Sequence, residues 1–137
     1  MKYYAVIDTN VLVSAMLKWN SVPGYVLEHT FVGDIIPLLN EQVLAEYIEV
    51  LNRPKFHFDK EKLGEVMEGL IKRGVFVDAE ETGIELPDSK DVIFYEIVME
   101  KRKSEEAFLV TGNIKHFPSA SFIVTPREML TILKMKE

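Results

Sequence analysis

The sequence predicts an α/β fold, a three-layer α/β/α sandwich with a mostly parallel central sheet. Short apolar runs, such as 3–7 and 107–110, are typical of strands that are buried on both faces. They alternate with longer stretches, such as 41–52 and 59–72, whose apolar residues recur with helical spacing. Strands that alternate with helices in this way favour a doubly wound domain with a parallel sheet.

The first strand is expected over residues 3–7 and leads directly into Asp8. The chain then turns, and 11–17 is expected to form a helix with Thr9 or Asn10 as its N-cap. Asp8 would stand at the carboxyl end of the first strand, where open α/β sheets hold their ligands. The alternative is that Asp8 only satisfies loop amides, because Asp is common at such turns.

The second strand is expected at 35–39, after a short helix over 24–32, although Pro37 is unusual inside a strand. Asn40 is expected to cap a helix over 41–52, which Pro54 stops. Helical spacing places one broad apolar face inward: Val43, Leu44, Tyr47, Ile48, Val50 and Leu51. Glu49 falls opposite this face, whereas Glu46 falls at its border and can lean toward a cleft. The alternative is that Glu46 is simply solvated.

The next helix is expected over 59–72, with these residues facing inward: Leu63, Val66, Met67, Leu70 and Ile71. A short strand at 75–77 and an acidic loop at 78–85 follow, and a helix opens at 87–91 and runs to about residue 101. Its apolar residues surround nearly the whole circumference, and Asp91 lies on an apolar stripe that continues through Phe94, Tyr95 and Val98. Capping accounts for Asp88 or Ser89, but it does not explain an inward-facing Asp91.

The strand at 107–110 ends in Thr111-Gly112-Asn113, a second strand end with polar side chains. A short strand follows at 122–124. Thr125 is then expected as the N-cap of the last helix, with Pro126 in its first turn and Glu128 completing a capping box.

Composition excludes several classes of protein. The 137 residues are 47% hydrophobic and 28% charged, which is typical of one globular core. The absence of cysteine rules out disulfides, zinc–thiolate sites and thiol catalysis. A net charge of −6 argues against binding nucleic acid by bulk attraction, but not against an enzyme with an acidic metal site.

No apolar run approaches the roughly 18 residues of a membrane helix, so we expect a cytoplasmic protein without membrane contact.

Four polar side chains are expected at strand ends or on adjoining helices: Asp8, Glu46, Asp91 and Asn113, with Asp88 as a further candidate. Acids gathered in a cleft repel one another unless a divalent cation lies among them. Oxygen ligands suit Mg²⁺ or Mn²⁺ better than zinc. The three histidines, His29, His57 and His116, lie in separate segments, and each is expected at the surface rather than as a ligand.

Five segments in order resemble the PIN-domain family, of the kind that forms the toxin component of toxin–antitoxin pairs: 6–15, 43–47, 87–94, 109–117 and 125–130. The likeness covers nearly the full length, so residues 1–137 are expected to form a single PIN-like domain. It implies a Mg²⁺- or Mn²⁺-dependent endoribonuclease that selects single-stranded RNA, with a small antitoxin protein as partner and a homodimeric assembly.

The same resemblance implies the roles of individual residues. Asp8, Glu46 and Asp91 match the acidic metal-binding positions, and Asp88 matches a further acid. Asn113 stands where the family frequently has an aspartate, so the number of bound metal ions is left open. We expect Asp8 and Asp91 to hold the ion, Glu46 to orient water or accept its proton, and Thr111 and Asn113 to position water or phosphate. Asn10 is a secondary candidate at the site. The candidates for contacts to the RNA backbone are Lys18, Arg53, Lys55, Lys115 and Arg127.

Three other readings remain. A haloacid-dehalogenase-like phosphatase is disfavoured because it needs a second acid where this chain has Asn10. A PIN fold that has lost catalysis through Asn113 would be an RNA- or protein-binding module. A nuclease that processes RNA, rather than a toxin, is the third.

Overall fold

The computed structural model describes residues 2–135, and the remaining positions of the expected domain lie outside the described residues. Its five strands are β1 (Tyr3–Ile7), β2 (Ile35–Leu39), β3 (Val75–Phe76), β4 (Ala107–Val110) and β5 (Ile123–Val124). The helices are α1 (Thr9–Leu17), α2 (Val22–Phe31), α3 (Glu41–Leu51), α4 (Lys60–Arg73), α5 (Val92–Lys101) and α6 (Pro126–Met135). Three 3-10 turns lie between them: η1 (Pro54–Phe56), η2 (Ser89–Asp91) and η3 (Ile114–His116).

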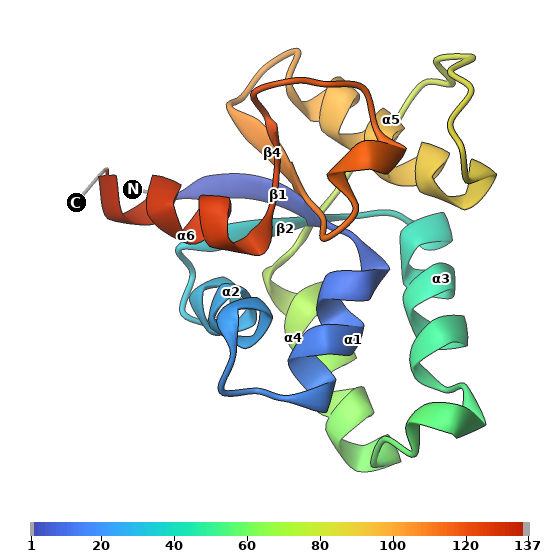
Figure 1. Cartoon of the computed structure of the whole chain (residues 1–137), viewed down its shortest axis with the longest axis vertical. Coiled ribbons are helices and arrows are strands. Elements are labelled where there is room, and N and C mark those ends of the chain that lie inside the picture. The colour runs from blue at the N-terminus through green and yellow to red at the C-terminus, as the bar shows by residue number, and fades with distance from the viewer. Residues whose placement is uncertain (1, 136–137) are drawn as a thin grey trace.

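The strands form one all-parallel sheet in the order β3-β2-β1-β4-β5, and helices cover both of its faces. Figure 1 shows α5 on one side of the sheet and α1, α2 and α4 on the other. Helix α5 packs on β1, β2 and β4, while α2 and α4 pack on β2. The three-layer α/β/α sandwich expected from the sequence is therefore confirmed.

The central strand β1 is where the order of the strands reverses. Its neighbours are β2, which follows it in the chain, and β4, which comes much later. In open parallel sheets, ligands bind at the carboxyl ends of the strands at such a reversal point. Because Ile7 is level with Val110 across β1 and β4, the next residues, Asp8 and Thr111, meet at this place.

The inward faces of two helices are narrower than the apolar pattern suggested. Ile48 of α3 and Ile71 of α4 were expected inside, but they are 50% and 46% exposed. Helix α3 packs against α1 and α5 at the edge of the sheet, so only a narrow stripe of it, including Val43 and Tyr47, is buried. The prediction was wrong for Ile48 and Ile71 because helical spacing shows the apolar arc but not how much of it a neighbour covers.

Several helix starts agree with the sequence. The side chain of Asn40 accepts a 2.8 Å hydrogen bond from the Val43 N–H. Thr125 and Glu128 exchange side-chain-to-backbone bonds of 2.9 and 3.1 Å, the reciprocal pattern of a capping box. Helix α2 starts at Val22, two residues earlier than expected, because Ser21 acts as its N-cap.

Helix α1 is capped differently from the prediction. Asp8, rather than Thr9 or Asn10, occupies the N-cap position, and its side chain makes no capping hydrogen bond. The Thr9 hydroxyl is buried without a partner among the described residues, and the Asn10 side chain turns away to Gly112. The Asn10 side chain therefore bonds to the end of a strand instead of capping the helix.

Within residues 2–135, none of the helices combines the length and apolar character needed to cross a membrane.

Candidate active site

Asp8 lies at the carboxyl end of β1 and is only 5% exposed. Its Oδ2 accepts a 2.7 Å hydrogen bond from the Thr111 hydroxyl and a 3.1 Å bond from the Asn10 side-chain amide. Burial raises the pKa of the Asp8 carboxyl above its ordinary value of 3.8, the Thr111 hydrogen bond opposes this, and the charge of Asp91 adds to it. Asp8 is thus a buried carboxylate that is held by two donors and repelled by a neighbouring acid.

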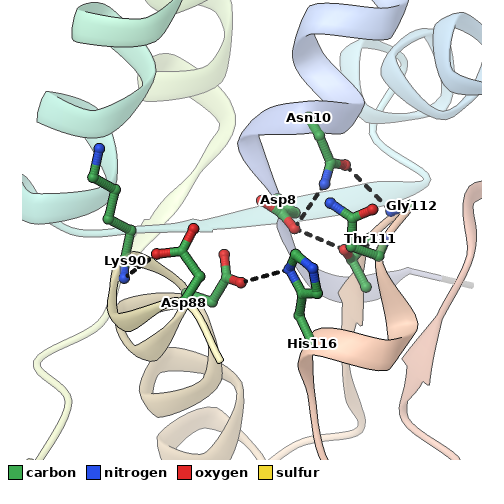
Figure 2. A network of polar contacts seen from close by, with 9 residues as sticks. Asp8, Asn10, Asp88, Lys90, Thr111, Gly112 and His116 are labelled. Atoms are coloured by element: carbon green, nitrogen blue, oxygen red, sulfur yellow. Dashed lines mark hydrogen bonds and ion pairs between the residues drawn. The ribbon is translucent and has the colours of Figure 1, made fainter. Parts of the chain in front are cut away.

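The strand end after β4 is tied to the start of α1. The Gly112 N–H donates to the Asn10 side-chain oxygen at 3.2 Å, and the Asn113 N–H donates to the Thr111 hydroxyl oxygen at 2.9 Å. Figure 2 shows Asp8, Asn10, Thr111 and Gly112 gathered at these two strand ends. The network fixes one oxygen of Asp8 and organises the turn that carries Asn113.

Asp91 approaches the same place from the other side, at the junction of η2 and α5. It is 8% exposed, so the expectation of an inward-facing Asp91 is confirmed. Its Oδ2 lies 3.1 Å from His116 Nδ1. Asp88 is exposed and caps η2 by accepting a 3.0 Å hydrogen bond from the Lys90 N–H. In Figure 2, His116 lies between Asp88 and the Asp8 network.

The pKa of Asp91 shows which acids surround it. Burial raises this pKa, and the hydrogen bond from His116 works in the opposite direction. The negative charges of Asp88 and Glu46 raise it further, as Asp91 in turn raises the pKa of Asp8. Four carboxylates contributed by β1, α3 and the start of α5 are therefore electrostatically coupled, with Asp91 at their centre.

Glu46 reaches this cluster from α3, which is anchored by the neighbouring Tyr47. The buried Tyr47 hydroxyl donates to the backbone oxygen of Ile7, directly before Asp8, and its ring packs 6.3 Å from that of Phe94. Burial, and secondarily the charge of Asp8, raise the pKa of Tyr47 far above its usual range, so the hydroxyl stays a neutral donor. Glu46 itself is half-buried and makes no hydrogen bond or ion pair with another described residue.

The donor set fits a hard divalent cation. Within residues 2–135, no group of three or more His, Cys, Asp or Glu side chains is arranged to hold a metal ion as it stands. An ion at this site would therefore take a few carboxylate oxygens, with water and substrate phosphate completing its coordination, as is usual for Mg²⁺. Burial chiefly, and the charges of neighbouring acids secondarily, raise the pKa values of Asp8 and Asp91, and a bound cation would favour the ionised form of both.

A family model of the PIN domain matches residues 4–115. The chain belongs to the PIN-domain family. PIN domains are generally nucleases, often metal-dependent ribonucleases, so the family agrees with an acidic site at the carboxyl edge of the sheet. No curated protein and no solved structure matches the chain.

The basic residues expected to contact RNA in this PIN domain are dispersed. Lys115 lies in η3, directly before His116. Lys18 directly follows α1, roughly 15 Å of helix rise from Asp8. Arg53 pairs with Glu49 at 2.9 Å, and Arg127 lines a hollow between α2 and α6. Only Lys115 shares a turn with a residue that contacts the acidic cluster.

Sequence reasoning missed the contact that His116 makes in this PIN domain. A surface position was expected for His116, and its side chain is 41% exposed, but its bond to Asp91 was not expected. The other two predicted surface histidines are His57, which is exposed, and His29, which pairs with Asp34 at 2.7 Å. The sequence feature that could have indicated this contact is the position of His116 within the segment 109–117, only five residues after Thr111.

Proposed function

We propose that this PIN-domain protein is an endoribonuclease that hydrolyses phosphodiester bonds of single-stranded RNA with the help of Mg²⁺ or Mn²⁺. The observation that carries the proposal is the coupled set of carboxylates, Asp8, Glu46, Asp88 and Asp91, at the reversal point of a PIN-domain sheet. Buried carboxylates that raise one another's pKa are costly without a cation, which is why such a cluster favours a metal-dependent activity.

Asp8 and Asp91 are the proposed ligands. The Oδ2 of each makes side-chain hydrogen bonds inside the protein, to Thr111 and Asn10 for Asp8 and to His116 for Asp91, and the Oδ1 of each makes no hydrogen bond to another described side chain. A bound divalent cation would lower the pKa of a coordinated water and stabilise the charge that develops on phosphate oxygens. Asp88 precedes η2, is exposed and adds negative charge close enough to raise the pKa of Asp91.

Glu46 is the proposed acceptor of the proton that the attacking water loses. Its carboxylate is half-buried and makes no hydrogen bond or ion pair with a described residue, so it is free to orient the water and take this proton. In the reaction, the water oxygen forms a bond to phosphorus, one ester P–O bond breaks, and the leaving oxygen takes up a proton. Thr111 holds Asp8, and Lys115, directly before His116 in η3, is a proposed contact to the RNA backbone.

Asn113 bears on the number of metal ions. Its amide oxygen can coordinate a cation or hold a water, but it carries no charge and cannot act as a base. The side chain is exposed, while its backbone N–H is fixed to the Thr111 hydroxyl. We therefore propose one tightly bound ion, with any second ion bound weakly.

The resemblance of the five sequence segments adds a cellular role to this proposal, that of a cytoplasmic toxin that forms a homodimer and is held inactive by a small antitoxin protein. A nuclease that processes RNA would share the chemistry but not the toxicity. Growth arrest on expression, relieved by a small protein encoded beside it, would support the toxin role.

Cleavage of a panel of single-stranded RNAs tests the proposed activity. We expect cutting with Mn²⁺ or Mg²⁺, none with EDTA, and recovery when the metal is restored. Matched duplex RNAs are the control, and they should be cut more slowly. A folded protein that cuts no RNA in the panel and binds no divalent ion would instead be a binding module, the alternative in which Asn113 marks lost catalysis.

A further inference from the structure

His116 stands in a position to control the geometry of the acidic cluster. Its Nδ1 lies 3.1 Å from Asp91 Oδ2, and no other described side chain donates to that carboxylate. A carboxylate with one oxygen fixed can present the other in only a narrow range of directions. Hydrogen-bond partners behind a metal ligand commonly orient it in this way.

The backbone of His116 is itself fixed from both sides. Its N–H donates to the Asn113 backbone oxygen at 2.9 Å, and the next residue, Phe117, is buried and donates to the Ile114 oxygen at 3.0 Å. Asn113 is in turn bonded through its N–H to the Thr111 hydroxyl. The ring therefore projects from a turn that is anchored to the end of β4.

The same short segment, residues 111–116, thus holds both proposed metal ligands. At one end the Thr111 hydroxyl donates to Asp8, and at the other the His116 ring bonds Asp91. Without His116, Asp91 would face the repulsion of Asp88 and Glu46 with no compensating donor among the described residues. The segment therefore contacts both carboxylates at once.

Fold stability alone does not account for the contact. Helix α5 is already docked by Phe94, Ile97 and Val98, all of which are buried, whereas the His116 ring is 41% exposed. A partly exposed hydrogen bond of this kind adds little to a helix that is packed so fully. The bond from His116 therefore acts mainly on the orientation of the Asp91 carboxylate.

We infer that His116 is a positioning residue that orients Asp91 for binding a divalent cation. The inference rests on the proposed metal-dependent function. It assigns His116 no contact with the cation or the RNA and no proton transfer. What it requires is a hydrogen-bond donor at the position of Nδ1.

A calorimetric titration of metal-free protein with Mn²⁺ measures the affinity for the ion and so tests the inference without measuring activity. His116→Phe keeps a ring but removes the donor, and it should weaken Mn²⁺ affinity about 10- to 100-fold, as losses of outer hydrogen-bond partners commonly do. His116→Asn places an amide N–H near the position of Nδ1 and should bind Mn²⁺ close to the wild-type affinity. His29→Phe is the matched control, because His29 makes the same Nδ1–Oδ2 contact, to Asp34, with a similar 38% exposure.

Melting temperatures measured before Mn²⁺ is added establish that each variant is folded. Should His116→Phe fail to fold, His116→Ala takes its place with the same expected loss. Wild-type affinity in a folded His116→Phe or His116→Ala overturns the inference and leaves the proposed function standing. An equal loss in His116→Asn also overturns it, since the donor would then not be what matters. A wild-type protein that binds no Mn²⁺ overturns the inference and the proposed metal-dependent function together.

Discussion

Asp8→Asn is expected to slow metal-dependent RNA cleavage by about 10³-fold, since a bound cation contributes several kcal/mol to such a reaction and each 1.36 kcal/mol is a factor of ten in rate. The substitution keeps the shape of the side chain. The amide oxygen of the new residue can accept the same hydrogen bonds from Thr111 and Asn10 that Asp8 Oδ2 accepts. The loss should therefore reflect the missing charge rather than a changed fold.

The stability of the metal-free protein should change in the opposite direction. The pKa of Asp8 is raised in the folded state, chiefly by burial, so the folded chain holds this proton more tightly than the unfolded chain does. Stability is consequently lost as the pH rises from about 3.8 through the raised pKa. At pH 7 without metal, Asp8→Asn should melt higher than wild type, and the difference should disappear below pH 3.8. Mn²⁺ should then raise the melting temperature of wild type and not of the variant.

Asp34→Asn is the control for these measurements, because Asp34 is a partly exposed acid paired with His29 away from the cluster. It should leave both cleavage and the effect of Mn²⁺ on melting unchanged. Wild-type cleavage by purified Asp8→Asn would remove Asp8 from the site and attribute any activity to another group or to a contaminant.

Glu46→Gln is expected to lower the cleavage rate by about 100-fold or more, the usual effect of removing a general base. Glu46 makes no hydrogen bond or ion pair with a described residue, and its charge repels Asp91, so the variant should fold and melt no lower than wild type. Because Asp8 and Asp91 remain in place, Mn²⁺ should still bind. The predicted result is a folded, metal-binding protein with a low turnover, measured by single-turnover cleavage beside the Mn²⁺ titration.

Glu49→Gln is the matched control on the same helix. Glu49 lies three residues further along α3, is exposed and pairs with Arg53 at the surface. Its substitution should leave turnover close to wild type. If both variants lost the same activity, the effect would come from the total charge of α3. If Glu46→Gln kept wild-type activity, Glu46 would be excluded as the base.

The sequence was sufficient to predict the positions of Asp8 and Asp91. An aspartate that directly follows a fully apolar strand has to lie at the edge of the sheet, and Asp8 does. Asp91 shares a helical stripe with Phe94, Tyr95 and Val98, and of these four Tyr95 is half-buried and the others are buried. In both cases the deciding information is local, because the spacing of a few neighbouring residues fixes where the side chain points.

Pairings between distant segments could not be derived in the same way. Strands that are apolar throughout show no alternation, so the sequence does not indicate that Ile7 is level with Val110. The bond from Thr111 to Asp8 follows from that register, and the contact of His116 with Asp91 follows from the turn after β4. The exposed Ile48 has the same origin, since its environment depends on how α3 packs against its neighbours.

The most direct test of the account is to locate Mn²⁺ in crystals of the protein by anomalous diffraction. We expect a peak between the carboxylates of Asp8 and Asp91, close to Glu46, with water completing the coordination of the ion. Crystals of Asp8→Asn grown under the same conditions should lack it. A well-occupied peak elsewhere, or none beside Asp8 and Asp91 under conditions in which the protein cuts RNA, would contradict the proposal that this acidic cluster is the metal centre.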